Sequence, residues 1–178
     1  MPSLLIGCGN SRIKKVHFEG NSEWAGKLVT ADMNPNCDPD YLLDLDISWW
    51  KKSLPWNDDT FDEIGAYDCL EHWGKQGDWR GWFDEMAEYH RILKPGGTMG
   101  ILVPVGGDAL ADPGHVRFFH ANWFYMLAQD FYAKAIAMDM PVTDYRWYWK
   151  KNFEILALEN HDNHHISVIL KKPDADKA

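Results

Sequence analysis

The sequence predicts an α/β protein in which helices pack on a mostly parallel sheet. Two observations predict this class. Short apolar runs of strand length alternate with segments of helical apolar spacing, and several of the runs end in glycine or acidic residues. The chain of 178 residues is expected to form one domain, residues 1–178, with a polar tail at 173–178 that is expected to fray.

The first predicted strand ends at Ile6 and runs into Gly7-Cys8-Gly9. Neither glycine carries a Cβ, so backbone can approach a ligand closely there. Residues 27–32 predict a second strand that ends at Asp32. An acidic residue roughly 20 positions past a glycine turn is where nucleotide-binding folds bond ribose hydroxyls. The alternative for Asp32 is a solvated acid in a strand-end turn.

The later elements follow in the same alternating order. Residues 41–46, 61–67 and 98–103 predict three further strands, and 79–93 predicts an amphipathic helix ended by Pro95-Gly96-Gly97. Residues 121–132 predict a second helix. Residues 153–158 and 166–170 predict an antiparallel hairpin. After Gly9, at most one or two helical turns fit before Gly20-Asn21, so the first helix is expected to be short or missing.

Several polar or glycine residues fall at the carboxyl ends of the predicted strands. Ligands of parallel sheets bind beyond these ends, so the residues together predict a single cleft. They are Gly7, Gly9, Asp32, Asp44, Tyr67 and Asp68.

Composition narrows the class of ligand and the compartment. The formal net charge of −9 disfavours DNA or RNA and favours a cationic ligand. The three cysteines, Cys8, Cys37 and Cys69, form no Cys-x-x-Cys pair. They therefore disfavour a disulfide scaffold or zinc knuckle and favour a reducing compartment. Neither a signal peptide nor a membrane span is predicted, and a cytoplasmic location is expected.

A set of motifs in fixed order resembles a known family. The pattern resembles class I S-adenosylmethionine-dependent methyltransferases, of which the turn at residues 93–97 (Leu-Lys-Pro-Gly-Gly) is a fairly specific mark. It looks most like a small phage and prophage branch that shares residues 71–78, 112–117 and 143–146. The motifs are residues 5–9, Asp32, 54–64, 70–72 and 91–97.

The resemblance implies a doubly wound, Rossmann-like sheet of seven strands in the order 3-2-1-4-5-7-6, with strand seven antiparallel. It implies S-adenosylmethionine as cofactor, S-adenosylhomocysteine as product, and the host cytoplasm as location if the protein is phage-encoded. The third glycine of many members is replaced here by Asn10 or Ser11. The cofactor-binding positions carried over are Gly7, Cys8, Gly9, Asn10, Asp32, Met33, Asp44, Leu45, Tyr67 and Asp68.

Catalytic and acceptor-binding candidates lie in the loops over the expected cleft. His115 and Asp68 are the candidate catalytic residues, and His115 is alternatively a loop brace that bonds an acid such as Asp112. Arg117, Tyr145 and Arg146, with His115, are the candidate acceptor-binding residues, and a structural ion pair is the alternative for the last two.

Other chemically suggestive residues have structural explanations. Glu71 and His72 are assigned to helix-start capping and packing. The cluster His161, Asp162, His164 and His165 is assigned to a solvated turn, so no metal ligands are predicted. Trp49, Trp50 and Trp56 are assigned to packing, with the border of an acceptor pocket as the alternative.

The function predicted is in-line methyl transfer from S-adenosylmethionine to a small molecule or a protein side chain. The alternative is a non-catalytic cofactor-binding or vestigial protein of the same fold, such as part of a phage assembly. A nicotinamide-dependent oxidoreductase is disfavoured because the full Gly-x-Gly-x-x-Gly and its helix are missing. The acceptor's identity and the oligomeric state are not predicted.

Overall fold

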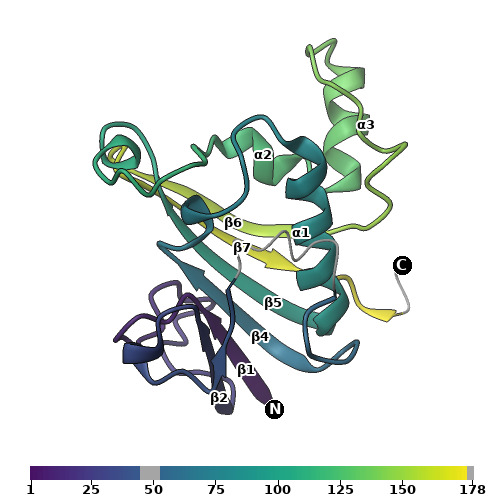
Figure 1. Ribbon diagram of the computed structural model, residues 1–178. Coiled ribbons are helices and arrows are strands. Elements are labelled where there is room, and N and C mark those ends of the chain that lie inside the picture. The colour runs from purple at the N-terminus through teal and green to yellow at the C-terminus, as the bar shows by residue number, and fades with distance from the viewer. Residues whose placement is uncertain (45–52, 176–178) are drawn as a thin grey trace.

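A computed structural model describes residues 1–44 and 53–175. It contains one seven-stranded sheet in the order β3-β2-β1-β4-β5-β7-β6 (Figure 1). This is the order expected from the sequence. The strands are β1 (Pro2–Ile6), β2 (Lys27–Asp32), β3 (Tyr41–Leu42), β4 (Phe61–Tyr67), β5 (Leu93–Pro104), β6 (Glu154–His161) and β7 (His165–Lys171).

Three α-helices and three short 3₁₀ helices connect the strands in the described ranges. The α-helices are α1 (Trp79–Ile92), α2 (Ala121–Tyr125) and α3 (Gln129–Ala137), and the 3₁₀ helices are η1 (Pro35–Cys37), η3 (Leu70–His72) and η4 (Asp108–Leu110). None of the helices found in these ranges is both long and apolar enough to cross a membrane.

The parallel half of the sheet sets the position of the site. Strands β3, β2, β1, β4 and β5 pair in parallel, and β7 pairs antiparallel with both β5 and β6. Ile6 pairs with Ala31 on one side and Ala66 on the other. The carboxyl ends of β1, β2 and β4 therefore lie at one edge, where their following turns converge.

One face of the sheet is covered by α1 and α2 (Figure 1). Phe83 and Met86 of α1 and Phe124 of α2 share one buried cluster with Ile64 of β4 and Ile101 of β5. Asp78 caps α1 by accepting a hydrogen bond from Gly81 N, which satisfies one of the free amide groups of the first turn. The apolar spacing seen in the sequence thus becomes the buried stripe of α1.

The segment between β1 and β2 packs on the other face without forming an α-helix. Val16 and Trp24 of this segment pack with Leu5 and Tyr67. A Cβ on Gly65 would lie 2.7 Å from the Trp24 ring, so this close approach requires glycine in β4. The expectation of a short or missing first helix is confirmed.

The prediction of one continuous helix over 121–132 is wrong, because the segment forms α2 and α3 with a break between them. Ala128 is extended there, with φ −98° and ψ 123°. The carbonyl oxygen of Leu127 accepts hydrogen bonds from Phe153 N (3.0 Å) and Trp149 Nε1 (3.0 Å) instead of continuing a helix. Tertiary partners therefore override a local pattern that is helical.

Most other elements agree with their predictions to within a few residues, but β5 begins at Leu93 instead of Thr98 and includes the predicted turn Pro95-Gly96-Gly97. Helix α1 ends at Ile92, before the predicted stop at Pro95, and β5 begins immediately at Leu93. The C-terminal antiparallel hairpin is confirmed by β6 and β7. Of the predicted strand 41–46, Tyr41–Leu42 form β3, and residues 45 and 46 lie outside the described residues.

The start of the predicted tail at 173–178 is held to the sheet. Pro173 is buried, and Lys172 Nζ donates to Asp59 and to the carbonyl oxygens of His90 and Leu93. Residues 176–178 lie outside the described residues.

The ion pair Lys14–Glu63 gives a test of how the helix-free segment is held. The side chains are 4% and 10% exposed, with Nζ 2.6 Å from Oε1. Lys14→Met is expected to lower the free energy of unfolding by about 3–5 kcal/mol, because it leaves the buried Glu63 without its counter-ion. Urea denaturation measures this. The double variant with Glu63→Gln should recover most of the loss.

Lys134→Ala is the matched control, since its exposed ion pair with Asp130 on α3 should matter little. A Lys14→Met variant as stable as this control would contradict the role assigned to the buried pair.

Candidate functional site

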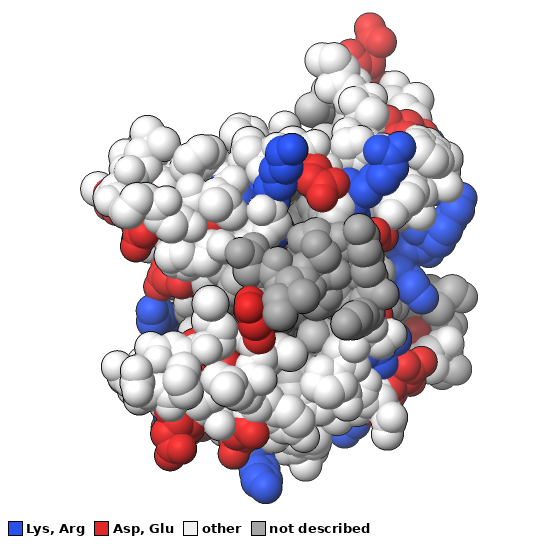
Figure 2. All heavy atoms as spheres, viewed as in Figure 1, with Lys and Arg blue, Asp and Glu red and all other residues white. Residues whose placement is uncertain are grey.

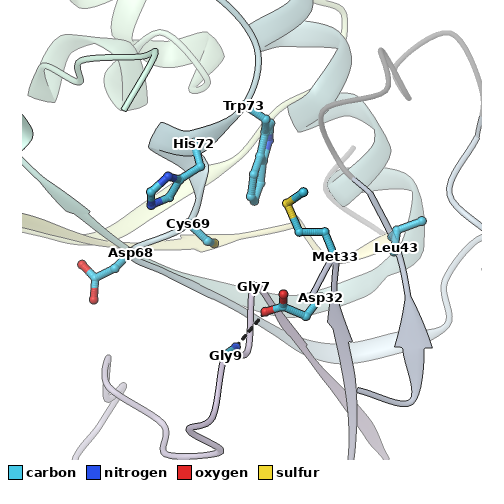
Figure 3. Close-up of a pocket in the computed structure, with 9 residues that line it drawn as sticks. All are labelled: Gly7, Gly9, Asp32, Met33, Leu43, Asp68, Cys69, His72 and Trp73. Carbon is cyan, nitrogen blue, oxygen red and sulfur yellow. Dashed lines mark hydrogen bonds between the residues drawn. The ribbon is translucent and has the colours of Figure 1, made fainter. Parts of the chain in front are cut away.

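A cavity of about 240 Å³ opens at the carboxyl ends of β1, β2 and β4 (Figure 3). Its wall is formed by the turns after these strands, as the sequence predicts for a parallel sheet. The lining residues are Gly7, Gly9, Asp32, Met33, Leu43, Asp68, Cys69, His72 and Trp73.

The glycine bend after β1 adopts left-handed backbone conformations. Gly7 has φ +61° and Gly9 has φ +48°, values that favour glycine. At Gly7 the space is also closed, because a Cβ there would lie 2.3 Å from Cys69 Cβ. At Gly9 a Cβ would meet no atom within 4 Å. Backbone at Gly9 therefore borders open space that a ligand can approach.

Asp32 joins the glycine bend to the turn after β2. Its Oδ2 accepts a hydrogen bond from Gly9 N at 2.7 Å, drawn as a dashed line in Figure 3, and its Oδ1 accepts one from Asn34 N at 2.8 Å. The residue is only 9% exposed. A carboxylate can accept about four hydrogen bonds. Asp32 thus retains acceptor capacity beside the cavity after both backbone groups are satisfied.

Arg12 does not line the cavity but holds the same bend by hydrogen bonds to backbone carbonyls. The sequence analysis missed this role. Its Nη1 donates to Gly9 O at 2.8 Å, and its Nη2 donates to Cys37 O at 2.7 Å and Asp38 O at 3.1 Å. The guanidinium therefore ties the segment after β1 to the turn that contains η1. The only signal in the sequence is an arginine three residues past the bend, where no helix forms.

Met33, Leu43 and Trp73 form an apolar part of the wall. Figure 3 shows the Met33 side chain extending from the end of β2 toward the Trp73 ring. Met33 is 60% exposed, whereas Trp73 is buried and its Nε1 donates to Glu85 Oε1 at 2.9 Å. The sequence analysis named Met33 but missed Leu43, Cys69, His72 and Trp73 as wall residues.

Four residues predicted to bind the cofactor do not line this cavity. Cys8 and Tyr67 are buried in the apolar cluster beneath the segment between β1 and β2, on the sheet face that α1 and α2 do not cover. Burial there raises the pKa of Tyr67 well above its usual value. Asn10 and Asp44 are exposed and absent from the wall. Leu45 lies outside the described residues.

Asp68 lines the cavity, but its carboxylate already contacts two basic groups. Oδ2 lies 2.7 Å from Lys15 Nζ, and Oδ1 lies 3.2 Å from His165 Nε2. The ion pair with Lys15 occupies Oδ2 and competes with a role of that oxygen as proton acceptor.

A second hollow of about 470 Å³ adjoins the first, and both are lined by Asp68 and His72. His115 lies in it, with Nδ1 2.9 Å from Ala109 O and Nε2 3.8 Å from Glu71 Oε1. The hydrogen-bond partner of His115 in this loop is therefore a backbone carbonyl and not Asp112. The Asp112 side chain instead accepts a hydrogen bond from Gly114 N. Glu71 is 1% exposed, and burial raises its pKa to about 7.

The predicted acceptor-binding residues lie apart from one another. Arg117 is 3% exposed and pairs with Glu85 at 2.6 Å, so its guanidinium is buried in the core and not at the cavity. Tyr145 lines a separate aromatic cavity of about 220 Å³ with Trp79 and Phe83. Arg146 pairs with Asp144 at 2.6 Å, which is the ion-pair alternative weighed from the sequence.

The remaining chemically suggestive residues have local partners. His161 Nε2 lies 2.8 Å from Ser167 Oγ, and His164 Nδ1 lies 2.9 Å from Asp108 Oδ2. Trp56 is buried against Phe61. Trp49 and Trp50 lie outside the described residues.

The glycine bend predicts different effects for two similar substitutions. Gly7→Ala should destabilise the fold by about 3 kcal/mol or more, because backbone strain of about 1–3 kcal/mol adds to the overlap with Cys69. Gly9→Ala is the matched control. It should cost only about 1–2 kcal/mol, because its Cβ meets open space.

Thermal and urea unfolding of both variants measure the difference. Equal losses of stability would contradict the contact between Gly7 and Cys69.

Comparisons with known proteins connect this geometry to a fold family. No protein-family model matches the sequence, and no curated protein matches it significantly. Among solved structures, the chain is similar to a SAM-dependent methyltransferase from Methanosarcina mazei, with TM-score 0.54, 13% identity, and 97% and 92% of the two chains covered. It is also similar to the N-methyltransferase NodS from Bradyrhizobium japonicum WM9, with TM-score 0.53, 12% identity, and coverage of 97% and 86%.

A third similar structure is the [4+2]-cyclase SpnF, with TM-score 0.56, 16% identity, and coverage of 98% and 75%. At these identities the similarity shows the fold alone, that of SAM-dependent methyltransferases. The comparisons do not support the phage and prophage branch that the sequence motifs resemble. The cyclase indicates that this fold carries more than one chemistry.

Proposed function

We propose that this protein binds S-adenosylmethionine in the cavity at Asp32 and transfers its methyl group to a small molecule or a protein side chain. The observation that carries the proposal is the Asp32 carboxylate beside the Gly9 amide, at the edge of an open cavity in a methyltransferase fold.

The residues present fit the nucleoside part of this cofactor. Asp32 keeps acceptor capacity for two ribose hydroxyls, and Gly9 leaves open space beside it. Met33 and Leu43 offer apolar side chains to a base. The roles of Asp44 and Leu45 at the base, and of Cys8, Asn10 and Tyr67, rest on the family resemblance alone.

When bound, S-adenosylmethionine supplies a methyl group already activated on a sulfonium, so the protein mainly orients two reactants. Asp68 adds a carboxylate to the cavity wall, and a negative charge favours a cationic ligand. His115 borders the adjoining hollow and is the candidate to position the acceptor or remove its proton.

The charge of the surface supports an acceptor that is a small molecule or a protein side chain and not a nucleic acid. On the face in Figure 2, acidic and basic side chains are interspersed, and the formal net charge is −9. A nucleic-acid-binding face is usually basic. A small molecule or a protein side chain is therefore the better match.

The second candidate function is cofactor binding without methyl transfer. It is favoured by the ion pair between Lys15 and Asp68, which occupies one oxygen of a predicted catalytic carboxylate, and by the fold's use in a cyclase. Binding of S-adenosylhomocysteine without methyl transfer to any acceptor would support this alternative over the first.

The proposed contact between Asp32 and the ribose is tested first by changing the ligand, because this leaves the hydrogen bonds of Asp32 to the protein backbone intact. Wild-type protein should bind adenosine about 10–100-fold more tightly than 2′,3′-dideoxyadenosine, because hydrogen bonds to a charged group contribute about 1.5–3 kcal/mol. Isothermal titration calorimetry measures both ligands. Asp32→Asn should weaken adenosine and S-adenosylhomocysteine and reduce the discrimination between the two nucleosides.

Asp130→Asn, on the exposed face of α3, is the control and should bind like wild type. Equal affinity of wild type for the two nucleosides would refute the assignment of Asp32 to the ribose.

A further inference from the structure

We propose that Glu71, His72 and His115 bind a divalent transition-metal ion in the hollow next to the cofactor cavity. One ligand atom of each side chain lies within 4.8 Å of the other two. The sequence analysis assigned no metal ligands, because it assigned Glu71 and His72 to capping and packing and His115 to the acceptor. The proposal concerns a second site and does not depend on cofactor binding. With the ion bound, Nε2 of His115 is a metal ligand and does not act as the proton acceptor.

Backbone hydrogen bonds bring the three residues together. Glu71 and His72 lie in η3, directly after β4, and His115 lies in the loop after β5. The carbonyl oxygen of Glu71 accepts from Val116 N at 2.9 Å and from Arg117 N at 3.2 Å. These bonds hold His115 beside Glu71 as part of the fold.

Glu71 presents a buried oxygen that lacks a partner. The residue is 1% exposed, and Oε2 has no hydrogen-bond partner among the described residues. Two cationic side chains in this region are occupied, since Arg117 pairs with Glu85 and Lys15 with Asp68. A buried carboxylate oxygen without a donor is costly, and a cation in the hollow would satisfy it.

His115 is oriented as metal-binding histidines are. Its Nδ1 lies 2.9 Å from the carbonyl oxygen of Ala109, which can only accept, so Nδ1 carries the proton. In the neutral ring, Nε2 then presents a lone pair 3.8 Å from Glu71 Oε1. Two acceptors thus face each other. A backbone carbonyl that fixes the other ring nitrogen is the usual support of a ligating histidine.

His72 is the third proposed ligand. Neither ring nitrogen forms a hydrogen bond with the described part of the chain, and the ring packs edge-on against His115 with centroids 4.7 Å apart. A tetrahedral ion with bonds of about 2.1 Å separates its ligand atoms by about 3.4 Å. Small side-chain rotations would therefore close the site.

The ligand types select the metal. Two imidazole nitrogens and one carboxylate oxygen suit Zn²⁺, Co²⁺ or Fe²⁺, whereas Mg²⁺ favours an octahedron of oxygens. Three protein ligands leave at least one coordination position open, as in catalytic sites. Because His72 also lines the cavity at Asp32, the ion would lie at the boundary of the two cavities.

Metal binding is tested on the full chain after removal of bound metal with a chelator. Calorimetry with Zn²⁺ should give one ion per chain, and Co²⁺ should give the visible absorption of a nitrogen- and oxygen-bound ion. Glu71→Gln, His72→Ala and His115→Ala should each weaken Zn²⁺ binding by ~100-fold or more. His161→Ala is the control and should bind Zn²⁺ like wild type.

The isosteric Glu71→Gln variant separates a metal ligand from a structural acid. Without metal it should be at least as thermally stable as wild type, because a buried carboxylate with an unpartnered oxygen is removed, and Zn²⁺ should raise the melting temperature of wild type only. The proposal is overturned if wild type binds no Zn²⁺, if it binds Mg²⁺ instead, or if Glu71→Gln loses stability while keeping Zn²⁺. S-adenosylhomocysteine binding to the metal-free protein is measured separately, so neither result decides the other.

Discussion

The carboxylate of Asp32 holds together the two turns that shape the cavity at the ends of β1, β2 and β4. Each of its oxygens accepts one backbone amide, from Gly9 after β1 and from Asn34 after β2. A charged acceptor makes these hydrogen bonds stronger than neutral ones. One residue therefore positions the glycine bend and offers its remaining lone pairs to a ligand. The geometry of the site depends on this contact more than on any other.

The contact matters because no helix forms between β1 and β2, in residues 7–26 that the structure describes in full. In nucleotide-binding folds that helix normally fixes the glycine turn and closes the sheet face. Here Arg12 fixes the turn from outside, while Lys14, paired with Glu63, and Trp24 anchor the segment to the sheet. Polar contacts of individual side chains thus replace the packing of a helix.

Much of the fold and the centre of the cavity could be predicted from sequence patterns. Strand order came from the family resemblance, and the meeting of Gly9 with Asp32 follows from parallel strands ending at one edge. Arg12 and Trp73 could not be predicted, because Arg12 also bonds Cys37 and Asp38 after β2 and Trp73 bonds Glu85 on α1, contacts that no local pattern includes. Arg117 was assigned to the acceptor because the sequence does not distinguish a buried arginine from an exposed one. The break at Ala128 depends on Trp149 and Phe153, which no local pattern includes.

The two adjoining cavities have different chemical characters. The first combines one carboxylate with glycine backbone and apolar side chains, which suits a nucleoside. The second gathers acids and histidines around a buried Glu71. Asp68 and His72 belong to both walls, so ligands in the two cavities would lie side by side.

The most direct measurement of the central claim is the shift of backbone amide resonances when S-adenosylhomocysteine is added to isotope-labelled protein. We expect the shifts to gather at Gly7, Gly9, Met33 and Leu43. Shifts that gather instead around Trp79 and Tyr145 of the aromatic cavity, or no shifts at saturating ligand, would contradict the account.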